Sequence, residues 1–262
     1  MVTSSLRVPK HGHTPGECED AARVLPAADE GTWLAAAVAD GASESLLAGP
    51  WADLLTRTVT DAVRDDDRVL RDVDRFAAAL MGAGEAWRRW LADYVADREA
   101  GGRPIAWYEQ PKLDRGPHAA VLAARFDTGP SATRWEVAAL GDSCLFHTRD
   151  DRLLRAFPLE SAAAFDNSPG LVNAFDRDGA LLARHVRTAS GAAEPGDRFF
   201  LCTDALAAWF LGAAERGDRP WHVLDEFTRS GDLDAFTAWL TTTRAEGLMR
   251  NDDVTVVHVA FE

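Results

Sequence analysis

An uninterrupted apolar run from Trp33 to Ala39, followed directly by Asp40 and Gly41, is the clearest hydrophobic pattern in the chain. Seven apolar residues are too few for a helix of their own, so the run predicts a buried strand that ends in a carboxylate. Glycine at the next position allows a tight turn and a close approach to the peptide oxygen. The end of this strand can therefore offer a carboxylate and a carbonyl oxygen to a hard cation, although an Asp-Gly pair alone also suits a plain strand-to-turn transition.

Apolar residues at helical spacing follow this strand. Residues 51–63 form an apolar stripe that predicts a helix, and Pro50 is well placed in its first turn. Between residues 76 and 95, apolar side chains recur at intervals of three and four residues. This second pattern predicts either one long helix or a pair of helices interrupted near Gly82 and Gly84.

From about Ile105 onward the pattern changes to short strands separated by Gly, Asp and Pro. These runs predict an antiparallel meander and cover His118–Phe126, Trp135–Leu140, Ser143–His147 and Arg152–Phe157. Just before them, Trp107 and Tyr108 are predicted to pack between sheet and helix, with the border of a cleft as the alternative. The segment from Pro158 to Gly179 predicts a long surface excursion, which in compact domains is usually functional or mobile.

The last third of the chain combines two buried strands with amphipathic helices. Residues 198–202 predict a strand that ends at Thr203-Asp204 and passes into a helix over 205–214. Two further helices are predicted around 221–227 and 233–243. A final strand over 254–261 begins immediately after Asn251-Asp252-Asp253.

Composition narrows the class of protein. The chain has 262 residues, 47% of them hydrophobic, and no linker, so we expect one domain over residues 1–262. A net charge of -14 argues against nucleic acid or an anionic membrane as the main partner. Three widely spaced cysteines without zinc spacing indicate reduced core residues. Since residues 1–13 contain no apolar run and no later segment is long enough to span a bilayer, we expect a soluble cytoplasmic protein.

Acidic residues stand at the ends of three predicted strands. Asp40 and Asp204 follow their strands, and Asp252 and Asp253 precede theirs, so antiparallel pairing can gather these acids at one rim of a sheet. Two carboxylates about 4 Å apart repel by roughly 4 kcal/mol at an effective dielectric constant near 20, so such a cluster must share protons or hold cations. Oxygen ligands without Cys or His at ligand spacing suit Mg²⁺ or Mn²⁺ far better than Zn²⁺.

These acids belong to an ordered set of short motifs that covers most of the chain. The set comprises Glu19-Asp20-Ala21, Val38-Ala39-Asp40-Gly41, Asp114-Arg115-Gly116, Leu140-Gly141-Asp142-Ser143, Pro195-Gly196-Asp197 through Thr203-Asp204, and Asn251-Asp252-Asp253-Val254-Thr255. Each motif alone is unspecific. Together, in this order, they resemble the metal-dependent protein phosphatase 2C family, and most closely its divergent bacterial branch.

The resemblance implies an α+β fold, a four-layer α-β-β-α sandwich with two antiparallel sheets and a metal centre at one edge. It implies two Mn²⁺ or Mg²⁺ ions, with a place for a third. By motif position, the metal ligands would be Asp20, Asp40, the carbonyl oxygen of Gly41, Asp204 and Asp252, with Asp114 for the third ion. Asp142 matches an acid that the family uses structurally, and Glu19 would support a ligand.

The resemblance also implies an activity. A hydroxide bridging the two metal ions would attack phosphoserine or phosphothreonine in a phosphoprotein, in line with the leaving group. Asp40 and Asp204 are the residues on which we expect catalysis to depend. A partner serine/threonine kinase and a role in bacterial signalling would fit this activity.

The sequence departs from the family pattern around the expected substrate. Pro15 stands where the family usually carries a phosphate-binding arginine, and Arg7, Lys10, His11 or His13 are candidates to replace it. Ala42 replaces a histidine considered as a general acid, and Asp253 replaces an asparagine. These changes leave the expected metal ligands intact.

Two other functions follow from the same residues. A phosphatase fold that binds a phosphoprotein or a metal and regulates a partner without turnover is favoured by the missing arginine and opposed by the complete carboxylate set. Gly141-Asp142-Ser143 superficially resembles an esterase nucleophile block. That esterase class needs a late Asp-x-x-His pair, and the carboxyl-terminal region has none.

Overall fold

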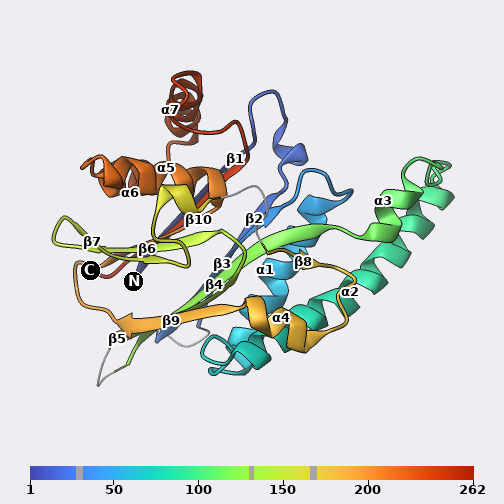
Figure 1. Cartoon of the computed structure of the whole chain (residues 1–262), viewed down its shortest axis with the longest axis horizontal. Helices are drawn as coiled ribbons and strands as arrows, with labels where there is room; N and C mark the ends of the chain where they lie inside the picture. The colour runs from blue at the N-terminus through green and yellow to red at the C-terminus, as the bar shows by residue number, and fades with distance from the viewer. Residues whose placement is uncertain (28–31, 130–132, 166–169) are drawn as a thin grey trace.

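Two antiparallel sheets pack face to face, and each is covered by helices on its outer side (Figure 1). The computed structural model describes residues 1–27, 32–129, 133–165 and 170–262. The first sheet has the strand order β1-β11-β10-β6-β7, and the second has the order β2-β3-β4-β5-β9, with β8 paired to β4. The predicted α-β-β-α sandwich is confirmed. The strands are β1 (Val2–Val8), β2 (Asp20–Pro26), β3 (Trp33–Gly41), β4 (His118–Thr128), β5 (Thr133–Leu140), β6 (Cys144–Arg149), β7 (Arg152–Phe157), β8 (Val172–Asn173), β9 (Arg187–Ala192), β10 (Arg198–Cys202) and β11 (Val254–Ala260).

The position of β3 in the fold explains why its sequence is an unbroken apolar run. Side chains alternate between the two faces of a strand, and both faces of β3 are covered. Ala35, Ala37 and Ala39 belong to the core beneath the helices, whereas residues such as Leu34 and Val38 belong to the core between the sheets. A polar side chain on either face of β3 would be buried, which is costly without a hydrogen-bond partner. The strand is therefore apolar along its whole length.

The outer face of the second sheet is covered by α1 (Ala48–Asp65), on which α2 (Val73–Ala100) packs in turn. Pro50 lies in the first turn of α1, as predicted. Helix α2 runs without interruption through Gly82 and Gly84, which decides between the two alternatives left open by the sequence. α4 (Gly179–His185) packs against α2.

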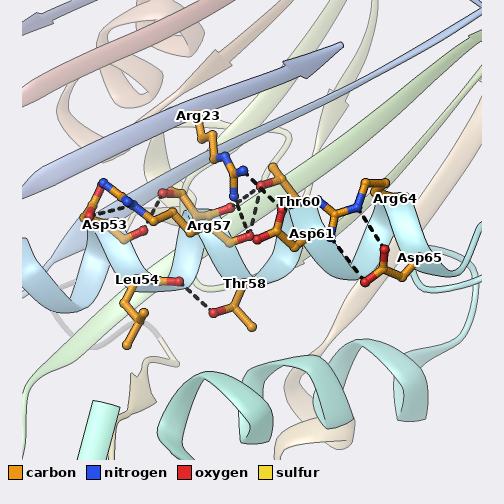
Figure 2. Close-up of polar contacts among 10 residues, drawn as sticks. Arg23, Asp53, Leu54, Arg57, Thr58, Thr60, Asp61, Arg64 and Asp65 are labelled. Atoms are coloured by element: carbon orange, nitrogen blue, oxygen red, sulfur yellow. Dashed lines mark hydrogen bonds and ion pairs between the residues drawn. The ribbon is translucent and has the colours of Figure 1, made fainter. Parts of the chain in front are cut away.

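The solvent side of α1 carries a row of ion pairs, which Figure 2 shows. Arg57 pairs with Asp53 and Arg64 with Asp61, at 2.9 Å in both cases. Arg23 reaches over from β2, contacts Asp61 at 3.1 Å, and donates a hydrogen bond to the carbonyl oxygen of Arg57 at 2.9 Å. Exposed pairs of this kind each contribute little stability, but the two Arg23 contacts fix β2, the strand that begins at Asp20, against α1.

The first sheet is covered by α5 (Asp204–Glu215), α6 (Pro220–Ser230) and α7 (Leu233–Ala245), as predicted (Figure 1). Aromatic side chains dominate this core. Phe146 of β6 stacks on Phe210 of α5 with ring centroids 4.0 Å apart. Within the described residues, no helix is both long enough and apolar enough to cross a membrane.

The predicted meander was wrong in one respect. β4 and β5 lie in the second sheet, whereas β6 and β7 lie in the first. The crossover occurs at Gly141-Asp142-Ser143, where Gly141 has φ +113° and Ala120 leaves no room for a side chain. The sequence marks a turn at this point but does not show which sheet the next strand joins.

Three other elements differ from prediction. The amino-terminal segment is not simply polar, since β1 pairs with β11 and buries Leu6 and Val8. Val172 is buried and pairs with β4, so the predicted surface excursion partly enters the core, while its residues 166–169 lie outside the described part. Trp107 and Tyr108 are 86% and 65% exposed, which overturns their predicted packing and places them before α3 (Gln110–Arg115).

Candidate active site

The first pair of acids is set by the register between β2 and β3. β2 begins at Asp20, β3 ends at Asp40 and Gly41, and the antiparallel pairing places Asp20 opposite Asp40. Asp20 is only 2% exposed, and Asp40 lies next to the carboxyl-terminal end of β3. Antiparallel pairing therefore joins residues that are distant in sequence, because the end of one strand meets the start of the other.

A second pair of acids lies at the ends of two paired strands in the other sheet. Asp204 is the first residue of α5 directly after β10, and Asp252 precedes β11, which pairs with β10 through Cys202 opposite Val256. The sequence predicted one rim of one sheet. The structure instead distributes the acids over the edges of both sheets.

Thr203 connects the two pairs across the sandwich. Its Oγ1 donates a hydrogen bond to Oδ2 of Asp20 at 2.8 Å and accepts one from the backbone N of Thr255 at 2.9 Å. Arg7 of β1 also crosses between the sheets and donates from Nη1 to the carbonyl oxygen of Asp20 at 3.0 Å. Thr203, which precedes Asp204, therefore holds the Asp20 side chain, while Arg7 holds the Asp20 backbone.

A cavity of about 480 Å³ opens where the two edges meet. We call it the acidic cavity, because five acidic residues line it, Asp40, Glu44, Asp142, Asp204 and Asp252, with Gly41 beside them. Asp20 is buried and does not line the cavity. The cavity also has basic side chains in its wall, from Lys112, Arg115, His118 and Arg250.

Burial and mutual repulsion dominate the electrostatics of these acids. Burial raises the pKa of Asp40 well above its usual value, and the carboxylates of Asp20 and Asp204 raise it further. Burial likewise raises the pKa of Asp20, against the hydrogen bond from Thr203, and the pKa of Asp252, where the charge of Asp204 adds to the effect. The protein alone therefore does not neutralise this group of carboxylates.

Two carboxylate oxygens in this group have no hydrogen-bond partner among the described residues. They are Oδ1 of Asp20 and Oδ1 of Asp204, and both are buried. A buried carboxylate oxygen without a donor is costly, and a cation is the usual way to satisfy it. The donor set, made only of oxygen atoms, fits Mg²⁺ or Mn²⁺.

An arginine stands close to where such a cation would bind. Nη2 of Arg250 forms an ion pair with Oδ2 of Asp204. Across the described ranges, no three His, Cys, Asp or Glu side chains lie together closely enough to hold a metal ion as they stand. The unpartnered oxygens favour a cation, while the present arrangement is open and partly occupied by Arg250, so metal binding would require the guanidinium to move.

Lys10 and Asp253 fix the amino-terminal segment beside the cavity. The Lys10 ammonium donates to Oε2 of Glu19 at 3.1 Å and to Oγ of Ser43 at 2.8 Å. The two carboxylate oxygens of Asp253 separately accept the backbone N–H groups of Lys10 and Glu19, each at 2.7 Å. An asparagine has only one such oxygen, so the aspartate at this position has a structural explanation.

Not every residue predicted for the site reaches it. Asp114 lies exposed on α3, accepts a hydrogen bond from Gln110 at 2.8 Å, and lines a different cavity. None of the four candidate phosphate-binding residues, Arg7, Lys10, His11 and His13, lines the acidic cavity. Sequence analysis missed Lys112, Arg115 and Arg250, because no signal separates them from the other Lys and Arg residues of the chain.

Comparison with known proteins adds an independent observation. A family model described as protein phosphatase 2C matches residues 9–251. Among solved structures, the Mycobacterium tuberculosis serine/threonine phosphatase PstP/Ppp is 16% identical, with a TM-score of 0.53 over 100% of this chain and 98% of that chain. The S. agalactiae serine/threonine phosphatase is 14% identical, with a TM-score of 0.57 over 100% and 99%.

A third similar structure, RsbX in complex with magnesium, is 15% identical, with a TM-score of 0.51 over 98% of this chain and 92% of that chain. At these identities the likeness to solved structures is evidence for the fold alone. None of the curated proteins matches the chain by sequence.

Proposed function

This chain belongs to the protein phosphatase 2C family, and we propose that it is a metal-dependent hydrolase of phosphate monoesters, acting on phosphoserine and phosphothreonine in proteins. The observation that carries the proposal is the pairing of Asp20 with Asp40 opposite Asp204 and Asp252, with buried carboxylate oxygens left unpartnered. Such an arrangement is costly to fold and is explained by a cationic ligand.

The proposed ligands for Mn²⁺ or Mg²⁺ are Asp40, Asp204 and Asp252 in the cavity wall, Asp20 behind them, and the carbonyl oxygen of Gly41. Divalent ions bound there would offset charge on the phosphoryl oxygens and lower the pKa of an attacking water. Asp114 is not part of the proposed set, because it lines another cavity. Thr203 and Arg7 keep Asp20 in place through their hydrogen bonds.

We further propose that the basic wall of the cavity binds the phosphoryl group. Lys112 and Arg115 of α3 line the cavity, and so does Arg250, which lies on the segment before β11. These side chains would replace the arginine that the family usually carries at the place of Pro15. A guanidinium can bind two phosphoryl oxygens at once, which orients the phosphorus atom toward the acids.

A second function, regulation of a partner without turnover, is favoured by one specific observation. The ion pair between Arg250 and Asp204 already neutralises one of the proposed ligands. If this pair persists in the presence of metal, the site would recognise a phosphoprotein without hydrolysing it.

Hydrolysis of p-nitrophenyl phosphate in the presence of Mn²⁺, compared between the natural chain and Asp40→Asn, tests the proposal. We expect turnover that requires the metal and falls at least about 100-fold in the variant, because the substitution removes a ligand. A circular dichroism spectrum and a thermal melt of Asp40→Asn serve as the folding control. Metal binding by calorimetry without turnover in the natural chain would favour the regulatory function.

A further inference from the structure

A second cavity, of about 360 Å³, lies between the amino-terminal segment and α7. We call it the basic cavity, because five of the residues that line it are Arg7, Lys10, His11, His13 and Arg244. Among the described residues in its wall, none is an aspartate or a glutamate. This composition is unusual for a chain with a net charge of -14.

Two guanidinium groups of the basic cavity bind only backbone oxygens. Arg244 donates from Nη2 to the carbonyl oxygen of Asp252 at 2.5 Å and from Nη1 to that of Pro9 at 3.5 Å. Its Nε is buried without a hydrogen-bond partner among the described residues. Arg7 donates to the carbonyl oxygen of Asp20.

Neither Arg7 nor Arg244 has a carboxylate within ion-pair distance in the part of the chain that the structure describes. The charges of Asp253 and Asp252 act on Arg244 from a distance, but neither guanidinium is held in an ion pair by a described residue. A ligand carrying negative charge would therefore gain a charge-assisted hydrogen bond from each guanidinium it reaches.

The basic cavity is separated from the acidic cavity by one layer of chain. Asp252 lines the acidic cavity, and its backbone oxygen accepts the bond from Arg244. Lys10 lines the basic cavity, and its ammonium reaches Ser43 in the wall of the acidic one. Residues that line one cavity therefore contact residues that line the other, so the two cavities are neighbours.

The lining of the basic cavity is partly apolar. Leu233 of α7 is 47% exposed, and Val8, Pro9 and Pro15 also line the cavity. Free phosphate has no apolar part that could pack on such a surface. The aliphatic stem of a glutamate side chain and the peptide backbone around it would pack there. The basic cavity therefore suits an acidic stretch of peptide better than a small anion.

We propose that the basic cavity binds an acidic segment of the phosphoprotein substrate, adjacent to the phosphorylated residue that enters the acidic cavity. This inference rests on the proposed function, since it names the sequence context that the phosphatase selects. It gives Arg244 a role in substrate selection, and it gives Arg7 this role in place of the phosphate binding for which the sequence made it a candidate.

A pair of threonines on α7 provides a matched test. Thr241 and Thr242 are neighbours, both are exposed, and each hydroxyl donates to the carbonyl four residues earlier. Only Thr241 lines the basic cavity. Thr241→Glu therefore places a negative charge in the cavity, and Thr242→Glu adds the same charge to the same helix outside it.

The direct measurement is fluorescence anisotropy with a labelled, unphosphorylated peptide rich in glutamate. We expect the natural chain and Thr242→Glu to bind it equally, and Thr241→Glu to bind it at least about tenfold more weakly through charge repulsion. Binding should also weaken with added salt. Equal binding by both variants, or no binding of the peptide by the natural chain, would overturn the inference.

Kinetics separate this inference from the proposed function. With matched phosphopeptides, Thr241→Glu should raise KM for the acidic sequence, leave kcat unchanged, and leave p-nitrophenyl phosphate hydrolysis as in Thr242→Glu. Absence of p-nitrophenyl phosphate hydrolysis in the natural chain would refute the proposed function, while the anisotropy result would still decide the peptide site. Hydrolysis without any preference for acidic peptides would refute only the site.

Discussion

Among single residues, Arg250 is the side chain that the proposed metal ion would have to displace. Its guanidinium pairs with Asp204, the acid whose other oxygen is buried and unpartnered. A divalent ion that binds Asp204 must compete with this positive charge. Once displaced, Arg250 remains in the cavity wall, where it can bind the phosphoryl group instead.

Replacing Arg250 separates these two roles. We expect Arg250→Gln to bind Mn²⁺ several-fold more tightly in calorimetry, because the competing charge is gone, and to raise KM for p-nitrophenyl phosphate several-fold. Arg216→Gln is a suitable control, because Arg216 is exposed on the opposite end of α5 and pairs with Asp218. Weaker metal binding by Arg250→Gln would show that the arginine supports the metal site rather than competing with it.

At the scale of elements, the end of β3 depends on a glycine for a steric reason. A methyl group on Gly41 would lie 2.7 Å from the carbonyl oxygen of Glu19 and 2.9 Å from Cβ of Ala48 in α1. The end of β3 can therefore pack between Glu19 and the start of α1 only if residue 41 has no side chain.

Two glycine substitutions test this packing by chemical denaturation. Gly41→Ala should destabilise the fold by about 1–3 kcal/mol, because both neighbouring groups are rigid. Gly82→Ala in α2 meets no atom within 4 Å, so it should be neutral or stabilise the chain by up to about 1 kcal/mol. If both variants had the same free energy of unfolding, close packing at the end of β3 would not explain Gly41.

The contact between β11 and α6 predicts a pH dependence of stability. Burial lowers the pKa of His258 to about 4 from its usual 6.5, against the attraction of Asp225. Nδ1 of His258 lies 3.0 Å from Oγ1 of Thr228, and Nε2 lies 3.7 Å from Asp225, while the charges of Arg198 and Arg229 further lower the pKa. The folded protein therefore keeps this imidazole neutral where the unfolded chain protonates it.

Between about pH 6.5 and 4 the unfolded state binds the additional proton at His258, so stability falls as the pH falls through this window. The loss attributable to this residue is at most about 1.4 kcal/mol per pH unit. Urea denaturation at several pH values should show a shallower dependence for His258→Gln than for the natural chain. An unchanged slope would contradict a buried neutral imidazole.

Much of the fold follows from the hydrophobic pattern. The run Trp33–Ala39 predicts a buried strand, and the apolar stripe of α1 predicts a helix. What the pattern does not contain is pairing between distant segments. The sequence did not predict β1, because β1 is an edge strand that buries only alternate residues. At Gly141 the chain passes from one sheet to the other without a change in the local hydrophobic pattern. The acids could be proposed because antiparallel pairing brings strand ends together and because their motifs resemble a known family, whereas no sequence feature distinguishes Arg250, Lys112 and Arg115 from other surface cations.

At the scale of the whole molecule, the site exists only because the two sheets face each other. Each sheet contributes one pair of acids, and the core between the sheets, which includes Phe126, Phe199 and Val257, sets the distance between the pairs. Neither pair has enough oxygen ligands for a two-metal centre by itself. The stability of the sandwich and the proposed chemistry are therefore linked through the same packing.

Anomalous diffraction from a crystal soaked in Mn²⁺ is the most direct test of the proposed metal centre. We expect manganese peaks in the acidic cavity, with oxygen atoms of Asp20, Asp40, Asp204 and Asp252 and the carbonyl oxygen of Gly41 among the ligands, at roughly 2.0–2.2 Å. We also expect Arg250 to leave Asp204. Fully occupied manganese at other positions, with these four carboxylates still apart and Arg250 still paired to Asp204, would contradict the proposal.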